Sequence, residues 1–449
     1  MLSLQHSTET NSTYLFMKPF ILLLLCAASL ITQAQTDKAR QAIKTKAASI
    51  EQKVIAWRRD IHEHPELGNR EFRTAELIAK HLQLLGIDVK TSVGKTGVVG
   101  LLKGGLPGPV IALRADMDAL PVYEKNDLPF ASKITTEYNG RTTGVMHACG
   151  HDTHVAMLMG AAEVLASMKK DLKGSVKFIF QPAEEGVPKG EEGGAELMVK
   201  EGVLENPKVD VIFGIHISST SEVGTITYRP GGAMASVNDL KITVTGKPSH
   251  GAQPWSSVDP IVVSAQIINS LQSIVSRNVN ITENPAVVTI GAIHGGNRGN
   301  IISEKVEMFG TVRTLSASDE KLVIKRINEI VTHTAQGAGA TAIVECPYES
   351  HYPVTFNDVA LTAKMLPSLQ KTAGAENVRL VPPITGSEDF SFFANKVPGL
   401  FLFLGGMPKE GDSKKAGPHH TPEFMIDESG LALGVNTFCN LVVDYANGR

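Results

Sequence analysis

The sequence predicts an α/β protein: a mainly parallel β-sheet sandwiched by helices, with a second domain inserted into the first. Two observations predict the sheet. Short apolar runs alternate with helical stretches along most of the 449 residues, which is typical of strands buried on both faces. Glycine is abundant, at 41 residues, as expected where many tight turns join strands and helices. The insertion is predicted by residues 236–347, which break this alternation.

Composition and charge narrow the class of protein. Hydrophobic residues make up 42% of the chain and charged residues 20%, so we expect a packed core and no extensive disorder. The 43 Lys and Arg against 46 Asp and Glu leave a net charge of −3, which argues against a nucleic-acid-binding or polybasic membrane-surface protein. The length fits two or three domains, or one large domain with an insertion.

Residues 1–34 have the pattern of a secretory signal peptide. Phe20–Ile31 is an almost wholly apolar run that is too short to cross a bilayer as a helix. Lys18 precedes it and Thr32–Ala34 follows it, which gives the charged start and small-residue exit of a cleaved signal. We expect Met17 to be the true start, cleavage after Ala34, and a secreted or periplasmic protein without a stable membrane anchor.

This segment has two alternative interpretations, a lipidated cysteine and an uncleaved anchor. Cys26 would be a lipidation site only if a small residue preceded it, and Leu25 stands there. Retention as an uncleaved anchor is the other alternative. After cleavage three cysteines remain, Cys149, Cys346 and Cys439. Since that number is odd, at least one is unpaired or has another role, and whether Cys346 and Cys439 pair stays open.

The elements of the first domain follow from their apolar spacing. Two amphipathic helices come first: one carries Ile50, Val54, Trp57 and Ile61 on a single face, and the next ends at Gly86. Five apolar runs are predicted strands: Val98–Leu102, Val110–Leu113, Val176–Phe180, Val209–Ile217 and Leu400–Leu404. Two further helices are predicted at Val155–Met168 and Leu431–Tyr445.

Residues 236–347 are predicted to form the inserted domain. Leu240, Ile242 and Val244 alternate with polar residues, as in a half-exposed strand. The later elements are a helix at Val258–Val275, strands at Ala286–Ile293 and Lys305–Thr314, a helix at Ser318–Thr334 and a strand at Thr341–Cys346. This β-α-β-β-α-β order predicts an antiparallel sheet with one open face. The first domain would then comprise residues 37–235 and 348–449.

Ionisable residues follow several of the predicted strands. Arg114–Asp118 follows one strand, Gln181–Gly186 the next, and His216 comes at the end of a third. His147–His154 lies between the first two and leads into a helix. Because sites in open α/β sheets lie at the carboxyl ends of strands, we expect these segments to meet at one edge of the sheet.

The side chains in these segments are those of a transition-metal site. Cys149, His151 and His216 are metal-ligand types, and the tandem Glu184 and Glu185 allow one carboxylate to bind a metal while its neighbour holds a water. Alone, the two glutamates would be solvated loop acids. Cys149 has two alternatives: a catalytic nucleophile with His151 as its base, or a plain buried cysteine.

These motifs resemble those of the M20 metallopeptidase clan, in particular its amidohydrolase branch of aminoacylases, hippurate hydrolases and indole-acetyl-amino acid hydrolases. The likeness covers roughly residues 40–447. Its matching segments are Arg58–Glu66, Arg114–Pro121, His147–His154, Gln181–Gly186, Gly246–Pro254, Ser387–Phe390 and His420–Phe424. The pairing of HACGHD with QPAEEG is specific. The resemblance implies a di-metal exopeptidase-like catalytic domain that carries a lid.

The resemblance also implies two divalent metal ions per subunit. Their ligands would be Cys149, His151, Glu185, His216 and His420, with Cys149 bridging the ions. His420 is preferred to His419 because the family places its ligand two residues before a proline, although His419 could substitute if the loop register differs. Zn, Mn, Co and Ni all suit such ligands.

Other roles carry over from the same resemblance. Glu184 would be the general base and acid. Asp118 would orient a ligand from behind. Asp116 and Glu388 would be neighbours of the site with less defined roles.

The resemblance gives the inserted domain a role as a lid and as the interface of a homodimer. His250 would reach a partner subunit's site and polarise the scissile carbonyl; the alternative is a surface loop histidine. Asn300 and Arg313 match lid positions that contact substrate, and Arg313 suits a free carboxylate, unless it is an ordinary exposed cation. Two departures, Trp255 after the lid proline and Pro248-Ser249 before the lid histidine, would favour larger or aromatic acyl groups.

The expected function is metal-dependent hydrolysis of the amide bond of N-acyl amino acids, by a metal-bound water with Glu184 as general base. The nearest alternative is an exopeptidase of the same clan, a dipeptidase or carboxypeptidase. A non-catalytic binding protein would be expected to have lost the base or a ligand, and none is lost. The acyl group, the amino acid and the native metal stay open.

Overall fold

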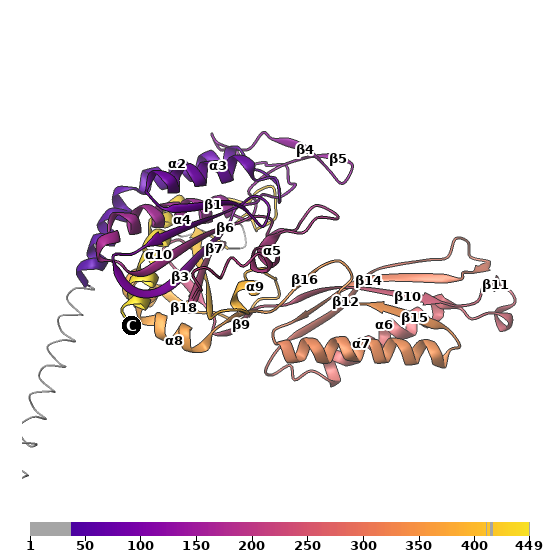
Figure 1. The fold of residues 1–449 in the computed structure, drawn as a ribbon. Coiled ribbons are helices and arrows are strands. Elements are labelled where there is room, and N and C mark those ends of the chain that lie inside the picture. The colour runs from indigo at the N-terminus through magenta and orange to yellow at the C-terminus, as the bar shows by residue number, and fades with distance from the viewer. Residues whose placement is uncertain (1–36, 410, 414–415, 449) are drawn as a thin grey trace, which may run out of the picture.

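The structure of this chain is a computed structural model that describes residues 37–409, 411–413 and 416–448. The expected signal peptide, residues 1–34, lies outside the described residues. The described chain forms a larger body with a central sheet and a smaller body that extends from it (Figure 1). In the part that the structure describes, none of the helices combines the length and apolar character that crossing a membrane requires.

The larger body contains one large sheet and its covering helices. The strands of the sheet are β1 Asp88–Val93, β2 Gly97–Lys103, β3 Leu106–Asp116, β6 Lys173–Gln181, β7 Val211–Glu222, β8 Ile226–Tyr228, β18 Val378–Leu380 and β19 Gly399–Met407. The helices are α2 Glu51–Glu63, α3 Phe72–Leu84, α4 His151–Ser167, α5 Gly194–Lys200, α8 Val359–Ala373, α9 Ser391–Ala394 and α10 Leu431–Ala446. Two small two-stranded antiparallel sheets are β4 Thr135–Tyr138 with β5 Arg141–Gly144, and β9 Gly231–Met234 with β17 Thr355–Asn357.

The strand order of the large sheet is β1-β2-β6-β3-β7-β19-β8-β18. Its centre, β6-β3-β7-β19, is parallel, and antiparallel pairing is found at β1–β2, β2–β6 and β19–β8. Successive side chains of a strand point to opposite faces. Leu113 therefore belongs to the core cluster that contains residues of α2, α3, α4, α8 and α10, and Ala112 to the one that contains residues of α5 and α9. The predicted sheet sandwiched by helices is confirmed.

The smaller body, called the lid below, consists of residues 237–352. Its elements are β10 Val237–Thr245, β11 Ser249–His250, α6 Pro260–Arg277, β12 Ala286–Gly295, β13 Ile301–Ile302, β14 Lys305–Thr314, α7 Ala317–Gly337, β15 Thr341–Glu345 and β16 His351–Tyr352. The order β12-β14-β10-β15 is antiparallel throughout. Helices α6 and α7 pack with the sheet around their own apolar core, on one side of it (Figure 1).

The structure differs from the expected elements at their boundaries. Strand β7 continues to Glu222, so His216 lies inside a strand and not at its end. Strand β16 adds His351–Tyr352 to the lid sheet by pairing with β10, past the expected boundary at 347. The edge strands β1, β8 and β18 were not predicted, because β8 and β18 are only three residues long and most side chains of β1 are exposed. Cys346 and Cys439 are both free and do not pair.

Candidate metal centre

Parallel pairing brings the polar segments to one edge of the large sheet. Strands β3 and β6 are in a register that sets Asp116 opposite Gln181, and β3 and β7 in one that sets Arg114 opposite Gly214. The segments after Asp116 and Gln181 therefore leave the sheet side by side, next to His216 of β7. This is the arrangement that the strand-end residues predict.

A glycine turn delivers the HACGHD motif to the same edge. Gly150 directly precedes α4 with φ of +89°, and a β-carbon there would lie 2.3 Å from Ile217 Cγ2. Only glycine satisfies both that backbone conformation and that close approach. The turn sets Cys149 and His151 on either side of Gly150, and both side chains are buried.

Two groups of potential metal ligands share the Cys149 sulfur. One is Cys149, His151 and Glu185; the other is Cys149, His216 and His419. Within each group the ligand atoms lie within 4.8 Å of one another. Cys149 Sγ is 3.4 Å from His216 Nε2 and 3.7 Å from His419 Nδ1. One ligand common to both groups is what a bridged pair of ions requires.

His151 gives the clearest test of whether a metal ion fits. Its ring is fully buried, and neither ring nitrogen has a hydrogen-bond partner among the described residues. Carboxylate oxygens of Asp116, Asp118 and Glu185 lie between 3.4 and 3.8 Å from these nitrogens. Burial alone would lower the pKa of His151, but the carboxylates outweigh it and raise the pKa to about 10. Orphaned imidazole nitrogens among buried acids fit a divalent cation.

The charges around Cys149 bear on its alternative role as a nucleophile. Burial raises the pKa of the Cys149 thiol well above its ordinary value, and Glu185 and Glu184 raise it further. Burial and the neighbouring carboxylates of Glu388 and Glu185 likewise raise the pKa of Glu184. The protein's own charges therefore oppose a thiolate, whereas a bound divalent cation would favour it. These charges disfavour Cys149 as a catalytic nucleophile and favour it as a metal ligand.

The loop that carries Glu184 and Glu185 is held by hydrogen bonds to its backbone. Asp118 accepts from the N–H groups of both glutamates, at 3.0 Å each. Glu71 accepts from the N–H of Ala183 at 2.9 Å. Ala183 itself has φ of +51°, a conformation that costs an alanine energy and is found mainly where surrounding contacts enforce it. Asp118 thus holds the backbone of this loop and also lies next to the His151 ring.

Tyr352 connects this loop to the lid. Its hydroxyl donates to the carbonyl oxygen of Glu184 at 2.9 Å. The residue lies in β16, where the chain returns from the lid to the larger body. Its pairing partner is Val237, the first residue of β10, and both residues line the cavity in front of the ligands. The backbone of Glu184 therefore has a hydrogen bond to a residue at the junction of the lid and the larger body.

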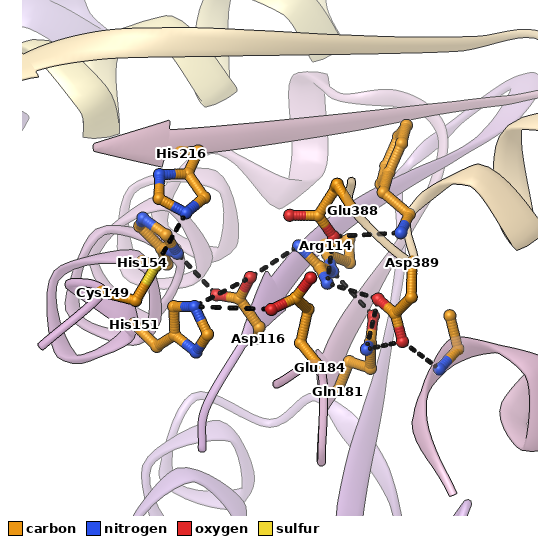
Figure 2. Close-up of polar contacts among 12 residues, drawn as sticks. Arg114, Asp116, Cys149, His151, His154, Gln181, Glu184, His216, Glu388 and Asp389 are labelled. Atoms are coloured by element: carbon orange, nitrogen blue, oxygen red, sulfur yellow. Dashed lines mark hydrogen bonds and ion pairs between the residues drawn. The ribbon is translucent and has the colours of Figure 1, made fainter. Parts of the chain in front are cut away.

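A buried network centred on Arg114 lies beside the ligands, with Asp116 between them (Figure 2). Its guanidinium donates to Asp116 at 2.7 Å, to Glu388 at 2.9 Å and to Asp389 at 3.0 Å. Its Nε donates to Gln181 at 2.8 Å. Burial opposes the charge of Arg114, but the carboxylates outweigh this and raise its pKa. The position of Asp116 between Arg114 and His151 follows from this network.

His154 is part of the network and is not available as a ligand. Its Nδ1 lies 2.5 Å from Asp116 Oδ1, and its Nε2 accepts from the N–H of Ile217 at 2.8 Å. Both nitrogens are committed, which makes the ring a neutral donor to Asp116. His154 therefore orients the Asp116 carboxylate and does not bind a metal ion.

Replacing Arg114 should destabilise the protein strongly. Arg114→Met leaves three buried carboxylates without their cation, and breaking a buried pair in this way typically costs about 3–5 kcal/mol of unfolding free energy. The check is urea unfolding in excess chelator, so that metal loss does not contribute. Arg70→Met is the control, because Arg70 and Glu191 form an exposed pair at 2.6 Å, and exposed ion pairs contribute little to stability. Equal losses in the two variants would contradict the prediction.

A cavity of about 900 Å³ opens in front of the ligands. Its wall includes Cys149, Glu184, Glu185, His216, Glu388, His419 and His420, and from the lid Arg313. The Arg313 guanidinium lies 3.3 Å from Ser387 Oγ and 3.4 Å from the Thr385 carbonyl oxygen. The positive charge of Arg313 thus faces the same space as the ligands.

His250 and Asn300 lie together, but not at this cavity. Strand β11 pairs with β13, which sets His250 opposite Ile301, and Gly251 N–H donates to the Asn300 carbonyl oxygen. Both side chains are exposed, at the end of the lid far from the larger body (Figure 1). Neither is among the residues that line the cavity of their own chain.

Two neighbouring histidines approach the ligands. His419 Nδ1 faces Cys149, while its Nε2 accepts from the N–H of Ser219 at 3.2 Å. That hydrogen bond puts the ring proton on Nδ1, which then cannot bind an ion. His420 Nε2 lies 3.1 Å from Glu185 Oε1, and His420 has φ of +64°. The backbone hydrogen bond thus argues for His420, as preferred from the sequence, although His419 is nearer to the sulfur.

Sequence reasoning did not assign roles to several residues that shape the site. Glu71, Gln181, His154, Tyr352 and Asp389 contribute hydrogen bonds to the loop or to the Arg114 network. Some signal was present, since His154 and Gln181 lie within the quoted motifs. Glu71 and Tyr352 have no such signal, because their contacts join segments about 100 or more residues apart, which no local pattern reveals.

The comparison with known proteins identifies the family. The chain matches the model of Peptidase family M20/M25/M40 over residues 112–444. The chain belongs to this family. The resemblance found in its motifs is thereby confirmed.

Relatives of the M20 chain include several hydrolases. Thermostable carboxypeptidase 2 of Saccharolobus solfataricus is 40% identical over 411 residues, 91% of this chain and 99% of the carboxypeptidase. N-acetylcysteine deacetylase of Bacillus subtilis is 38% identical over 394 residues, 87% of this chain and 96% of the deacetylase. The YXEP protein of Bacillus subtilis, a dinuclear metal-binding peptidase of the M20 family, superposes with a TM-score of 0.72 at 35% identity, covering 89% and 99% of the two chains. The M20 chain described here is a hydrolytic enzyme.

Proposed function

We propose that this enzyme is a metal-dependent amidohydrolase that releases the amino acid from N-acyl amino acids. The observation that carries the proposal is the cluster of ligand types around the Cys149 sulfur, in which His151 and Glu185 lie close to it and His216 Nε2 is 3.4 Å away, with Glu184 and His420 on the wall of the same cavity. A deacetylase of small N-acyl substrates is among the relatives, which supports the substrate class.

Two divalent ions per subunit are proposed, held by Cys149, His151, Glu185, His216 and His420. Cys149 belongs to both groups and would bridge. When bound, such ions would polarise the amide carbonyl and lower the pKa of a water molecule from about 15.7 to near 7. Zn, Mn, Co and Ni remain equally compatible with the donor set.

Glu184 is proposed to move the proton. Its carboxylate Oε2 lies 3.9 Å from His151 Nε2, and its backbone is fixed by Asp118 and Tyr352. Glu184 would accept a proton from the attacking water at a carboxylate oxygen and return it to the leaving amine nitrogen. Arg313 would bind the free carboxylate of the amino acid through paired N–H donors, which selects amides of amino acids.

The lid is proposed to complete the site of a second subunit. His250 and Asn300 lie together at the exposed end of the lid, so within one chain they contact no substrate in the cavity. In a homodimer formed through the lid they would reach the partner's cavity, where His250 would donate to the carbonyl oxygen of the substrate. The exposed Trp255 near His250 would then contact the acyl group of the substrate and favour larger or aromatic acyl groups.

A second candidate function is supported by one observation. Two carboxypeptidases of Saccharolobus solfataricus are each 40% identical to this chain over 411 residues. An exopeptidase would use the same ligands and the same base, and would differ only in what the cavity accepts in place of the acyl group. The substrate comparison below separates the two.

The test is amine release from a panel of N-acyl amino acids and dipeptides. The enzyme is assayed as purified, after chelation, and after adding back single divalent metals. We expect hydrolysis of acyl amino acids that is lost on chelation and restored by metal. Preference for dipeptides would favour the exopeptidase. Activity that survives chelation but not thiol alkylation would return Cys149 to the role of nucleophile and overturn the proposal.

We also propose that the enzyme acts outside the cytoplasm. The support is the apolar run Phe20–Ile31 with Lys18 before it and Ala34 after it. Expression of the full chain followed by sequencing of the mature N-terminus tests this, with Gln35 expected as the first residue.

A further inference from the structure

The cavity extends well beyond the ligands, along one face of the large sheet. His216 on β7 is paired with Phe403 on β19, and Phe403 is paired with Thr227 on β8. Paired residues share a face of the sheet, and neighbouring strands are about 4.8 Å apart. All three line the cavity, so it spans about 10 Å of sheet from His216 to Thr227.

An aromatic floor lies between the two ends of this span. The ring of Phe403 is 5.8 Å from the ring of His216, and that of Phe401 is 6.3 Å from it. The lining also includes Val381, Pro382 and Ile384. The middle of the cavity is thus apolar, and suits methylene groups better than charged or strongly hydrated ones.

At the far end of the floor stands Arg229. Asn357 fixes it beside Phe401: the Asn357 amide donates to the carbonyl oxygens of Arg229 and Phe401, at 2.8 and 2.9 Å, and accepts from the Phe401 N–H. Arg229 is half-buried and lines the cavity. Its backbone is therefore held firmly while its side chain lies at the cavity wall.

The guanidinium of Arg229 has no partner among the residues that the structure describes, with neither an ion pair nor a hydrogen bond to it. The other cation of the wall, Arg313, has Ser387 and Thr385 as partners and is close enough to Asp239 for that carboxylate to affect its pKa. Of the acids in the wall, Glu388 is paired with Arg114, and Glu184 and Glu185 lie at the ligands. Arg229 is thus an unmatched, partly desolvated cation at the end of an apolar channel, where an anion would bind most favourably.

We propose that Arg229 binds a carboxylate at the far end of the acyl chain, so that the preferred substrates are N-(ω-carboxyacyl) amino acids. This inference rests on the proposed amidohydrolase function. Arg313 takes the carboxylate of the amino acid, the scissile amide lies at the ligands, and the methylene groups of the acyl chain lie over Phe401 and Phe403. Arg229 is then a residue that determines acyl specificity and takes no part in proton transfer.

The experiment uses pairs of substrates that differ only at the acyl terminus. Succinyl, glutaryl and adipoyl derivatives of one amino acid are compared with their terminal carboxamides, and N-acetylglutamate is compared with N-acetylglutamine to probe the amine side. We expect kcat/KM of the metal-loaded enzyme to favour the acyl carboxylate about 10- to 100-fold, as a charge-assisted hydrogen bond allows. Arg229→Gln should abolish that ratio and leave the carboxamide substrates within about threefold.

Arg379→Gln is the matched control. Arg379 is the next cation at this edge of the sheet, on β18, but its side chain is half exposed and lies 3.8 Å from Glu222. It should leave the ratio unchanged.

Three outcomes would overturn the inference: an unchanged ratio in Arg229→Gln, an equal loss on all substrates, or a change confined to the glutamate and glutamine pair. Failure of the proposed function itself would look different, since the metal-loaded wild type would then hydrolyse no acyl amino acid, N-acetyl substrates included.

Discussion

Glu184→Gln is expected to lower kcat by about 10²–10⁴-fold, the range for removal of a general acid–base group. The amide keeps the shape of the side chain and the backbone hydrogen bonds to Asp118 and Tyr352, but it cannot accept the proton of the attacking water. Metal content should not change, because Glu184 is in neither ligand group that shares Cys149. Steady-state kinetics together with metal analysis of the same preparation provide the check.

The control for this variant is Glu191→Gln. Glu191 follows in the same connection between β6 and α5, but it forms an exposed pair with Arg70 away from the ligands. Its replacement should leave kcat within about twofold. A Glu184→Gln enzyme with near wild-type turnover would rule out Glu184 as the base, and an inactive one that had lost its metal would reassign it as a ligand.

Replacement of Cys149 should separate its possible roles. Cys149→Ala removes the atom common to both ligand groups, so metal affinity should fall by more than the roughly 10- to 100-fold typical of losing a supporting residue, and activity with it. Cys149→Asp supplies a carboxylate, which is also a ligand for such ions, and should retain part of the bound metal and of the activity. The measurements are metal titration and kcat for both variants.

A thiol nucleophile predicts a different pattern. If Cys149 were the nucleophile, activity would be lost equally in Cys149→Ala and Cys149→Asp, and the metal content of both variants would be unchanged. Cys346→Ala is the control, because Cys346 is a free thiol that lies in the lid next to β15 and outside both ligand groups. A Cys149→Asp enzyme that is active without bound metal would contradict both proposed roles of Cys149, as a metal ligand and as a nucleophile.

The sheet and its helices were predictable because their signals are local. The apolar run at Val110–Leu113 is long enough to mark a strand buried on both faces, and the polar residues directly after it mark the edge where a site forms. The lid was predictable in the same way from the order of its elements. The exact length of β7 was not, because its last residues are polar and partly exposed and are held in the sheet by pairing with β19.

The sequence by itself determined the fold class, the ligand types and the tandem glutamates, since each is written in residues that are adjacent or regularly spaced. Only the tertiary structure decided which groups share a space. It showed that Arg114 holds Asp116 of its own strand together with Glu388 and Asp389 from a distant segment. It also showed that Tyr352, at the junction of the lid and the larger body, donates to the Glu184 carbonyl oxygen. It also set Arg229 at the end of an apolar floor, and His250 and Asn300 away from the cavity of their own chain. The physical reason is that these relations depend on strand register and chain crossings, which bring together residues tens to hundreds of positions apart, whereas a periodic pattern reports only what a residue shares with its near neighbours.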